Sequence, residues 1–208
     1  MSKKPSYEFT FSIQRGWVRL PVRDNPGKFA RDRKVEAWAA GQARSMLGDS
    51  AEPERLNERA QQLTRATYGA RARDALHGLV FYTEPDAPGP LAFLDVLRLV
   101  PDQQVYPELT TGVLRELFAQ PSAGTLGDID EQQVDLPGGP ALRVRRQRAE
   151  PSDPTGQSTV MEGVTYAIRP PGLDDAIVVT MTWAALQYGD RLAAMAEAIA
   201  RSVRITLD

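Results

Sequence analysis

Four arginines crowd one short segment of the chain, with no acidic residue among them: Arg143, Arg145, Arg146 and Arg148. Guanidinium groups bind carboxylates and phosphates well. The segment is therefore a candidate docking patch for an acidic partner, a phosphate or an RNA backbone. The alternative interpretation is an exposed strand that charge keeps solvated and protects from edge-to-edge pairing. Aromatic residues for base stacking are missing from it, which argues against specific nucleic-acid recognition.

Nucleophilic catalysis has few candidate residues in this chain. His77 is the single histidine, there is no cysteine, and no Gly-x-Ser-x-Gly elbow occurs. A Ser-His-Asp triad would have to use His77, and nothing in the sequence orients it. The sequence therefore predicts a protein that is not an enzyme, with no catalytic residue and no cofactor.

Carboxylates gather in one predicted loop, at Asp128, Asp130 and Glu131, and again at the pair Asp174 and Asp175. Neither spacing matches an EF-hand calcium loop, and acidic loops are usually only solvated. A carboxylate-based glycosidase would need a second converging group and an aromatic cleft, which this region lacks. We therefore expect no metal site, and we keep a carboxylate-based enzyme as the least favoured alternative.

Two further features are interpreted structurally. The Pro-Gly-Gly-Pro run at 137–140 lacks the lysine and Ser/Thr of a phosphate loop and precedes a strand, so it predicts a hairpin turn. The large aromatic side chains fall at strand or helix spacing and are expected to be core residues: Trp17, Trp38 and Trp183.

The last part of the chain predicts a strand followed by a helix. Residues 176–183 alternate with period two and are apolar on both faces, as in an interior strand. Asp190 is the expected N-cap of a helix over 191–203, which has one apolar stripe. Residues 91–100 are also apolar on both faces and predict a second interior strand.

The rest of the chain divides into short strands and three helices. Residues 7–13 and 17–22 predict a hairpin, with Pro21 at its edge. Helices are expected over 28–47, 52–75 and 109–118, the first two lying over one sheet face. Further strands are expected at 79–82, 131–136, 141–148 and 160–168. Consecutive hairpins favour an α+β fold with a mostly antiparallel sheet and helices packed on it.

Composition limits the class of protein. The 208 residues are enough for one core, and we expect a single domain over 1–208. A formal net charge of −2 argues against a general nucleic-acid binder. No signal-peptide core and no run of about 18 apolar residues is found, so we expect a soluble cytoplasmic protein. The preference for arginine over lysine is typical of a high-GC bacterial genome.

The chain resembles the Mog1/PsbP-like superfamily in its architecture. The resemblance depends on the Trp-Val-Arg-Leu-Pro run at 17–21, the strand 178–183, and the helix that ends Ala-Arg-Ser-Val-Arg-Ile at 200–205. It implies an α/β/α sandwich and non-catalytic binding or assembly roles, with no functional residue to transfer.

The function that we predict is a non-enzymatic binding or accessory protein that presents a sheet or helix surface to a protein partner. The alternative is a small-molecule or lipid carrier with a cavity between sheet and helices. The identity of the partner is open, and so is self-association into a homo-oligomer.

Overall fold

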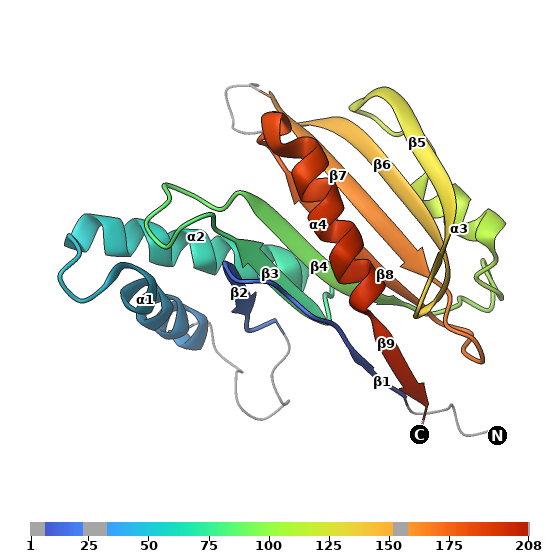
Figure 1. Cartoon of the computed structure of the whole chain (residues 1–208), viewed down its shortest axis with the longest axis horizontal. Helices are drawn as coiled ribbons and strands as arrows, with labels where there is room; N and C mark the ends of the chain where they lie inside the picture. Colours follow the sequence, from blue (N-terminus) through green and yellow to red (C-terminus); the bar gives the residue numbers. More distant parts are fainter. Residues whose placement is uncertain (1–6, 23–32, 152–157, 208) are drawn as a thin grey trace. The chain divides into compact units, whose positions relative to one another are not determined.

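The computed structural model describes residues 7–22, 33–151 and 158–207, which form four α-helices and nine strands. The class is α+β with mostly antiparallel strands, as predicted (Figure 1). The chain divides into two compact units, one made of residues 14–97 and the other of 1–13 with 98–208. The single domain expected over residues 1–208 therefore remains a prediction. No helix among the described residues is long and apolar enough to cross a membrane.

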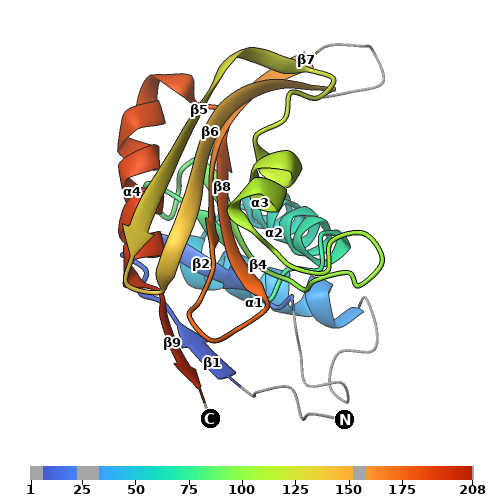
Figure 2. The same ribbon diagram turned by 90° about the vertical axis from the view of Figure 1, so that its right-hand side faces the viewer.

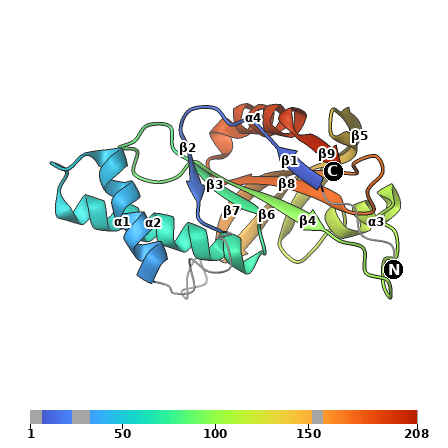
Figure 3. The same ribbon diagram turned by 90° about the horizontal axis from the view of Figure 1, so that it is seen from below.

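The unit of residues 14–97 combines a small antiparallel sheet with two helices. Its strands run in the order β2 (Trp17–Leu20), β3 (His77–Phe81) and β4 (Ala92–Leu99). The helices α1 (Arg33–Leu47) and α2 (Pro53–Ala72) lie side by side (Figure 3). The expected first helix began at residue 28, and residues 28–32 lie outside the described part of the chain.

Close packing of α2 on β3 holds this unit together. A Cβ atom at Gly78 would lie 2.8 Å from the Cβ of Ala70, so only glycine permits the approach seen between strand and helix. Ala39 and Leu63 are fully buried in the same apolar cluster as Val80. The cluster confirms that the helix pair covers this sheet, and β2 lies at the sheet's edge and ends before Pro21, as predicted.

The second unit is built on four long strands in the order β8-β7-β6-β5. They are β5 (Thr125–Leu136), β6 (Gly139–Pro151), β7 (Ser158–Ile168) and β8 (Ala176–Trp183). The hairpin predicted around 137–140 is confirmed, with Leu136 opposite Gly139. The helices α3 (Thr111–Phe118) and α4 (Gly189–Ser202) lie on opposite faces of these strands (Figure 2).

The core of this unit is the interface of β8 with α4. Ile177, Val179, Met181 and Trp183 are all fully buried on one face of β8. Five residues of the C-terminal stripe are also buried: Leu192, Met195, Ala196, Ile199 and Val203. The apolar pattern therefore predicted this interface correctly, because a single stripe on a helix must face the sheet.

Two predicted helix starts are wrong by a few residues. The helix α4 begins at Gly189 after Tyr188, so Asp190 is in the first turn and is not the N-cap. Its carboxylate accepts a bond from Arg145 instead of capping the backbone. The third helix begins at Thr111, where the Thr110 hydroxyl accepts from the backbone N–H of Val113 at 3.2 Å. The N-cap residue of α4, Tyr188, makes no side-chain cap bond, and Thr110 could not be distinguished from Thr111 as the cap of α3 in the sequence.

The predicted hairpin between 7–13 and 17–22 is wrong. Strand β1 (Tyr7–Thr10) pairs antiparallel with β9 (Arg204–Leu207) at the other end of the chain, as Figure 1 shows. Strand β2 pairs with β3. The backbone N–H of Ser12 also donates to the Ser202 hydroxyl at 2.9 Å. Alternation of apolar residues identified β1 and β2 as strands, but it carries no information about which strand is the partner.

Candidate functional site

The four arginines of β6 are divided between the two faces of the sheet. Side chains alternate along a strand, so Arg143 and Arg145 lie on the α4 face while Arg146 and Arg148 lie on the opposite face. They therefore do not form the single patch that their spacing suggested. Strand β6 is paired with β5 on one side and β7 on the other. Protection of a free edge, the alternative interpretation, does not apply to an interior strand.

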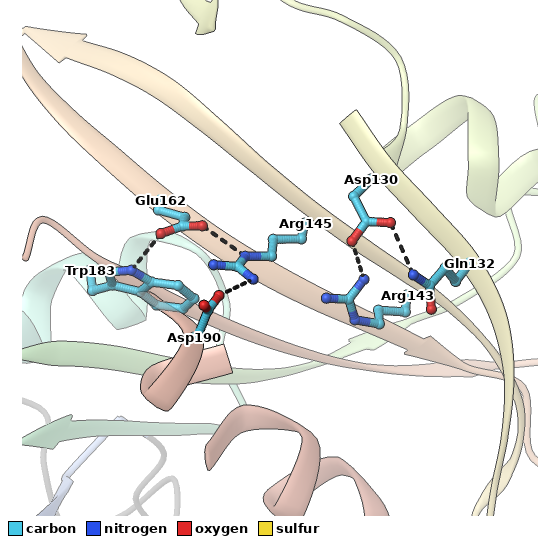
Figure 4. A network of polar contacts seen from close by, with 7 residues as sticks. All are labelled: Asp130, Gln132, Arg143, Arg145, Glu162, Trp183 and Asp190. Carbon is cyan, nitrogen blue, oxygen red and sulfur yellow. Dashed lines mark hydrogen bonds and ion pairs between the residues drawn. The ribbon is translucent and has the colours of Figure 1, made fainter. Parts of the chain in front are cut away.

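Arg145 belongs to a network that ties α4 to the sheet (Figure 4). Its Nε donates to Glu162 Oε1 at 2.7 Å, and its Nη1 donates to Asp190 at 2.8 Å. The other carboxylate oxygen of Glu162 accepts from the indole N–H of Trp183 at 3.0 Å. Glu162 is only 5% exposed, so its charge is compensated inside the protein. This arrangement is that of an internal ion pair, and Arg145 is not available for docking.

The backbone at the start of α4 must pass close to this network. A Cβ atom at Gly189 would lie 2.5 Å from Glu162 Oε2 and 3.1 Å from Arg145 Nη2. Any larger residue would push the carboxylate or the guanidinium out of place. Nothing in the local sequence indicates this role of Gly189, which becomes visible only through residues far away in the chain.

Arg143 is likewise engaged within the protein. Its Nη1 donates to Asp130 Oδ2 at 2.6 Å, and the amide of Gln132 donates to the other oxygen of Asp130 at 3.1 Å (Figure 4). The hydrogen bond from Arg143 holds the pKa of Asp130 below its usual value. A general acid needs the opposite shift, so the arrangement suits a structural ion pair and not acid catalysis.

The remaining acidic candidates do not converge on one point. Asp128, Asp130 and Glu131 lie within β5 and not in the predicted loop. Successive strand residues point to opposite faces, and Glu131 accepts from Arg115 of α3 at 2.5 Å while Asp130 pairs with Arg143. Among the described residues, no group of three acidic or histidine side chains could hold a metal ion.

The other acidic pair and the histidine also have structural positions. Asp175 is buried and accepts from Arg98 Nε at 2.6 Å, while Asp174 is exposed. His77 is the first residue of β3, half-buried and opposite Val96. Trp183 is a core residue, as predicted, and Trp38 and Trp17 are half-buried.

Arg146 and Arg148 line a hollow on the sheet face opposite α4. Its lining comes from β6, β7 and β8 and comprises Arg146, Arg148, Met161, Glu162, Gly163, Thr165, Thr180 and Thr182. We name it the Gly163 hollow, because Gly163 lies in register between Arg146 and Thr182 and contributes no side chain. The volume of the hollow is about 50 Å³, and the hollow is partly open to solvent.

The two arginines of the Gly163 hollow differ in their partners. Arg148 forms an ion pair with Glu150, the next acidic residue along β6. Within the described residues, the half-buried side chain of Arg146 has no ion pair and no hydrogen bond to protein. Burial lowers the pKa of the Arg146 guanidinium, and the nearby charge of Arg148 lowers it further. Among the residues that the structure describes, this face thus carries a partly desolvated cation without a countercharge.

The sequence alone points to the arginines of β6 but not to the residues that surround them in the structure. Neither Glu162 nor the three threonines of the Gly163 hollow was singled out, since isolated carboxylates and threonines in a strand are common. One indication was present in the sequence, because Arg143 and Arg145 have odd residue numbers while Arg146 and Arg148 have even ones. Since side chains alternate along a strand, the odd-numbered and even-numbered arginines must lie on opposite faces of the sheet.

A hollow also lies beside α3, where the carrier alternative could be sought. Its lining mixes apolar residues with polar ones: Leu114, Val134, Pro140, Ala141 and Leu142 with Thr111, Gln133, Asp135 and Arg169. A site for a lipid tail would be lined mainly by apolar side chains. This hollow does not favour a carrier.

Comparisons with known proteins concern the fold. No family model matches the chain, and no curated protein matches it. Among solved structures, the chain is similar to LpqN of Mycobacterium tuberculosis, described as involved in cell envelope biogenesis. That likeness has 14% sequence identity and a TM-score of 0.50, and it covers 98% of this chain and 86% of LpqN. The resemblance to the Mog1/PsbP-like superfamily stays a prediction; what the chain shares with LpqN is the fold.

Proposed function

We propose that this chain is a non-enzymatic binding or accessory protein that docks a protein partner on the sheet face around the Gly163 hollow. The observation that carries the proposal is the environment of the Arg146 guanidinium. A half-buried guanidinium beside a second arginine loses hydration without gaining a countercharge within the described residues. That arrangement costs free energy, and an acidic group on a partner would offset the cost.

The other arginines support the choice of this face. Arg143 and Arg145 are already neutralised by Asp130, Glu162 and Asp190. They fix the position of β5 and α4 against β6, so their charge serves the fold. The docking patch predicted from the sequence is accordingly reduced to Arg146 and Arg148.

The non-enzymatic character is proposed from the carboxylates. Asp130, Glu131 and Glu162 each accept a hydrogen bond from an arginine. A carboxylate engaged by a guanidinium in this way is not free to act as a nucleophile. LpqN is described as involved in cell envelope biogenesis, and an accessory role of this chain in such a process is compatible with the proposal. Cell fractionation with an antibody against the chain tests the cytoplasmic location predicted from the sequence.

The proposal is tested by capture of partners with a charge-reversed face. Three tagged versions are compared in the native host after chemical crosslinking: the unmodified chain, the double variant Arg146→Glu with Arg148→Glu, and Arg191→Glu. Arg191 is exposed on α4, on the other face of the sheet. It is the matched control for a change of charge. Far-UV circular dichroism and a thermal melt check that all three fold.

We expect one set of crosslinked proteins to be shared by the unmodified chain and Arg191→Glu and lost from the double variant. Binding that the Arg191 change reduces as strongly would place the partner elsewhere. Equal capture by all three chains would refute docking at the Gly163 hollow.

A further inference from the structure

We propose that the Gly163 hollow is a subsite for a tetrahedral oxyanion, phosphate or sulfate, and that this group is what the docked partner presents. The inference rests on the proposed function for the source of the anion, and on the geometry of β6, β7 and β8 for the site itself. Three neighbouring strands bring their donors to one point because the register places Arg146, Gly163 and Thr182 side by side.

The missing side chain of Gly163 creates the space. A Cβ atom there would lie 3.1 Å from Thr182 Cγ2 and 3.2 Å from the carbonyl oxygen of Met181. A larger residue would therefore fill the floor of the hollow and press on β8. With glycine, a ligand can approach the sheet backbone between Arg146 and Thr182.

The lining supplies hydrogen-bond donors from two types of side chain. Arg146 and Arg148 bring guanidinium groups, which carry only donors. The hydroxyls of Thr165 and Thr180 are 3.1 Å apart, so one of them donates to the other. Each hydroxyl has a single hydrogen, and the accepting hydroxyl therefore keeps its own for a ligand. Thr182 adds a third hydroxyl to the same hollow.

Two carboxylates lie near the site and must be counted against it. Glu150 pairs with Arg148 and neutralises part of its charge. Glu162 also contributes to the lining, but its carboxylate accepts from Arg145 and Trp183 of the α4 face. Arg146 is thus the cation that remains to be neutralised within the described residues, and the pKa shift that burial and Arg148 impose on it has the direction expected for an uncompensated cation.

The donor set fits a tetrahedral anion better than a carboxylate. A carboxylate is planar with two oxygens, and one guanidinium fork engages both of them. A phosphate monoester has three terminal oxygens that accept hydrogen bonds and a charge of about −1.5 to −2 at pH 7. Two guanidinium groups with hydroxyls on a second and third strand can engage all three.

The test is a titration of the full chain with inorganic phosphate and sulfate, followed by ¹H–¹⁵N NMR at constant ionic strength. The amide of Gly163 reports on the hollow directly. The variants are Arg146→Gln, which removes the charge, and Thr182→Val, which removes a hydroxyl and keeps the branched shape that strands favour. Arg191→Gln on α4 is the matched control.

We expect the Gly163 amide to shift with phosphate and sulfate. Arg146→Gln should weaken binding about tenfold or more, the loss typical of a hydrogen bond to a charged group, Thr182→Val should weaken it by a smaller factor, and Arg191→Gln should leave it unchanged. Equal phosphate affinity in Arg146→Gln and the unmodified chain would overturn the inference. Acetate that binds as tightly as phosphate would do so as well.

A parallel titration with O-phosphoserine identifies the source of the anion. Tighter binding of O-phosphoserine than of inorganic phosphate indicates a monoester on a protein. The reverse order indicates a free anion and refutes presentation of the anion by the partner, although the oxyanion site itself stands in both cases. The proposed function and the oxyanion subsite are refuted by different results. Phosphate bound at Gly163 without loss of crosslinked partners in the double variant refutes docking and leaves the subsite intact, while lost partners without phosphate binding refute the subsite alone.

Discussion

Replacement of Glu162 with alanine removes the acceptor that Arg145 and Trp183 share. Trp183 is fully buried, and the side chain of Arg145, 24% exposed, keeps only its contact with the exposed Asp190. The change therefore leaves a buried indole N–H without its partner and a partly desolvated guanidinium paired only with an exposed carboxylate. We predict that Glu162→Ala lowers the free energy of unfolding substantially.

The magnitude follows from burial. Removing one member of a buried ion pair typically costs about 3–5 kcal/mol, since the other charge stays desolvated. Glu162→Gln keeps an oxygen for Trp183 and loses only the charge, so a cost of about 1.5–3 kcal/mol is expected. Asp190, whose side chain is 94% exposed, is the matched control. Loss of an exposed partner of Arg145 should cost at most about 1 kcal/mol.

The assay is equilibrium unfolding in urea at neutral pH, followed by far-UV circular dichroism. The midpoint and slope are compared for the unmodified chain, Glu162→Ala, Glu162→Gln and Asp190→Ala. The predicted order of destabilisation is Glu162→Ala, then Glu162→Gln, then Asp190→Ala. If Glu162→Ala costs no more than Asp190→Ala, the buried network does not stabilise the attachment of α4, and the reasoning is wrong.

Gly189→Ala should destabilise the chain although alanine favours helices, because the new Cβ would lie 2.5 Å from Glu162 Oε2. Gly41→Ala on α1, where nothing lies within 4 Å, should instead stabilise by up to about 1 kcal/mol, and thermal melts of the pair test the difference. The hydrogen bond from Arg143 lowers the pKa of Asp130 in the folded protein. The ionised Asp130 should therefore stabilise the fold at any pH above its unfolded-state pKa of about 4. This contribution should be lost as the pH falls through the lower folded-state pKa. Stability measured from pH 7 to pH 2 should therefore fall less steeply in Asp130→Asn, and identical slopes would contradict the shift.

The sequence determined the local elements of this protein. Strand β8 and helix α4 were predictable because an apolar run with period two and a stripe with helical spacing each allow one arrangement of the backbone. The β5–β6 hairpin was also predictable, because Pro137 and Gly138 form a turn that joins neighbouring strands. The four arginines were also found, as an unusual concentration of charge.

Tertiary structure decided which of those charges are free. The carboxylates that neutralise Arg143 and Arg145 lie 13, 17 and 45 residues away, at Asp130, Glu162 and Asp190. Pairing of β1 with β9 was equally beyond reach, because it joins the two ends of the chain. The alternation of side chains along a strand places Arg146 and Arg145 on opposite faces of the sheet. Only the packing of α4 on one of these faces makes the two faces different. The site proposed at Gly163 exists because β6, β7 and β8 pair in one particular register. A shift of one residue would have exchanged the arginines between the two faces of the sheet.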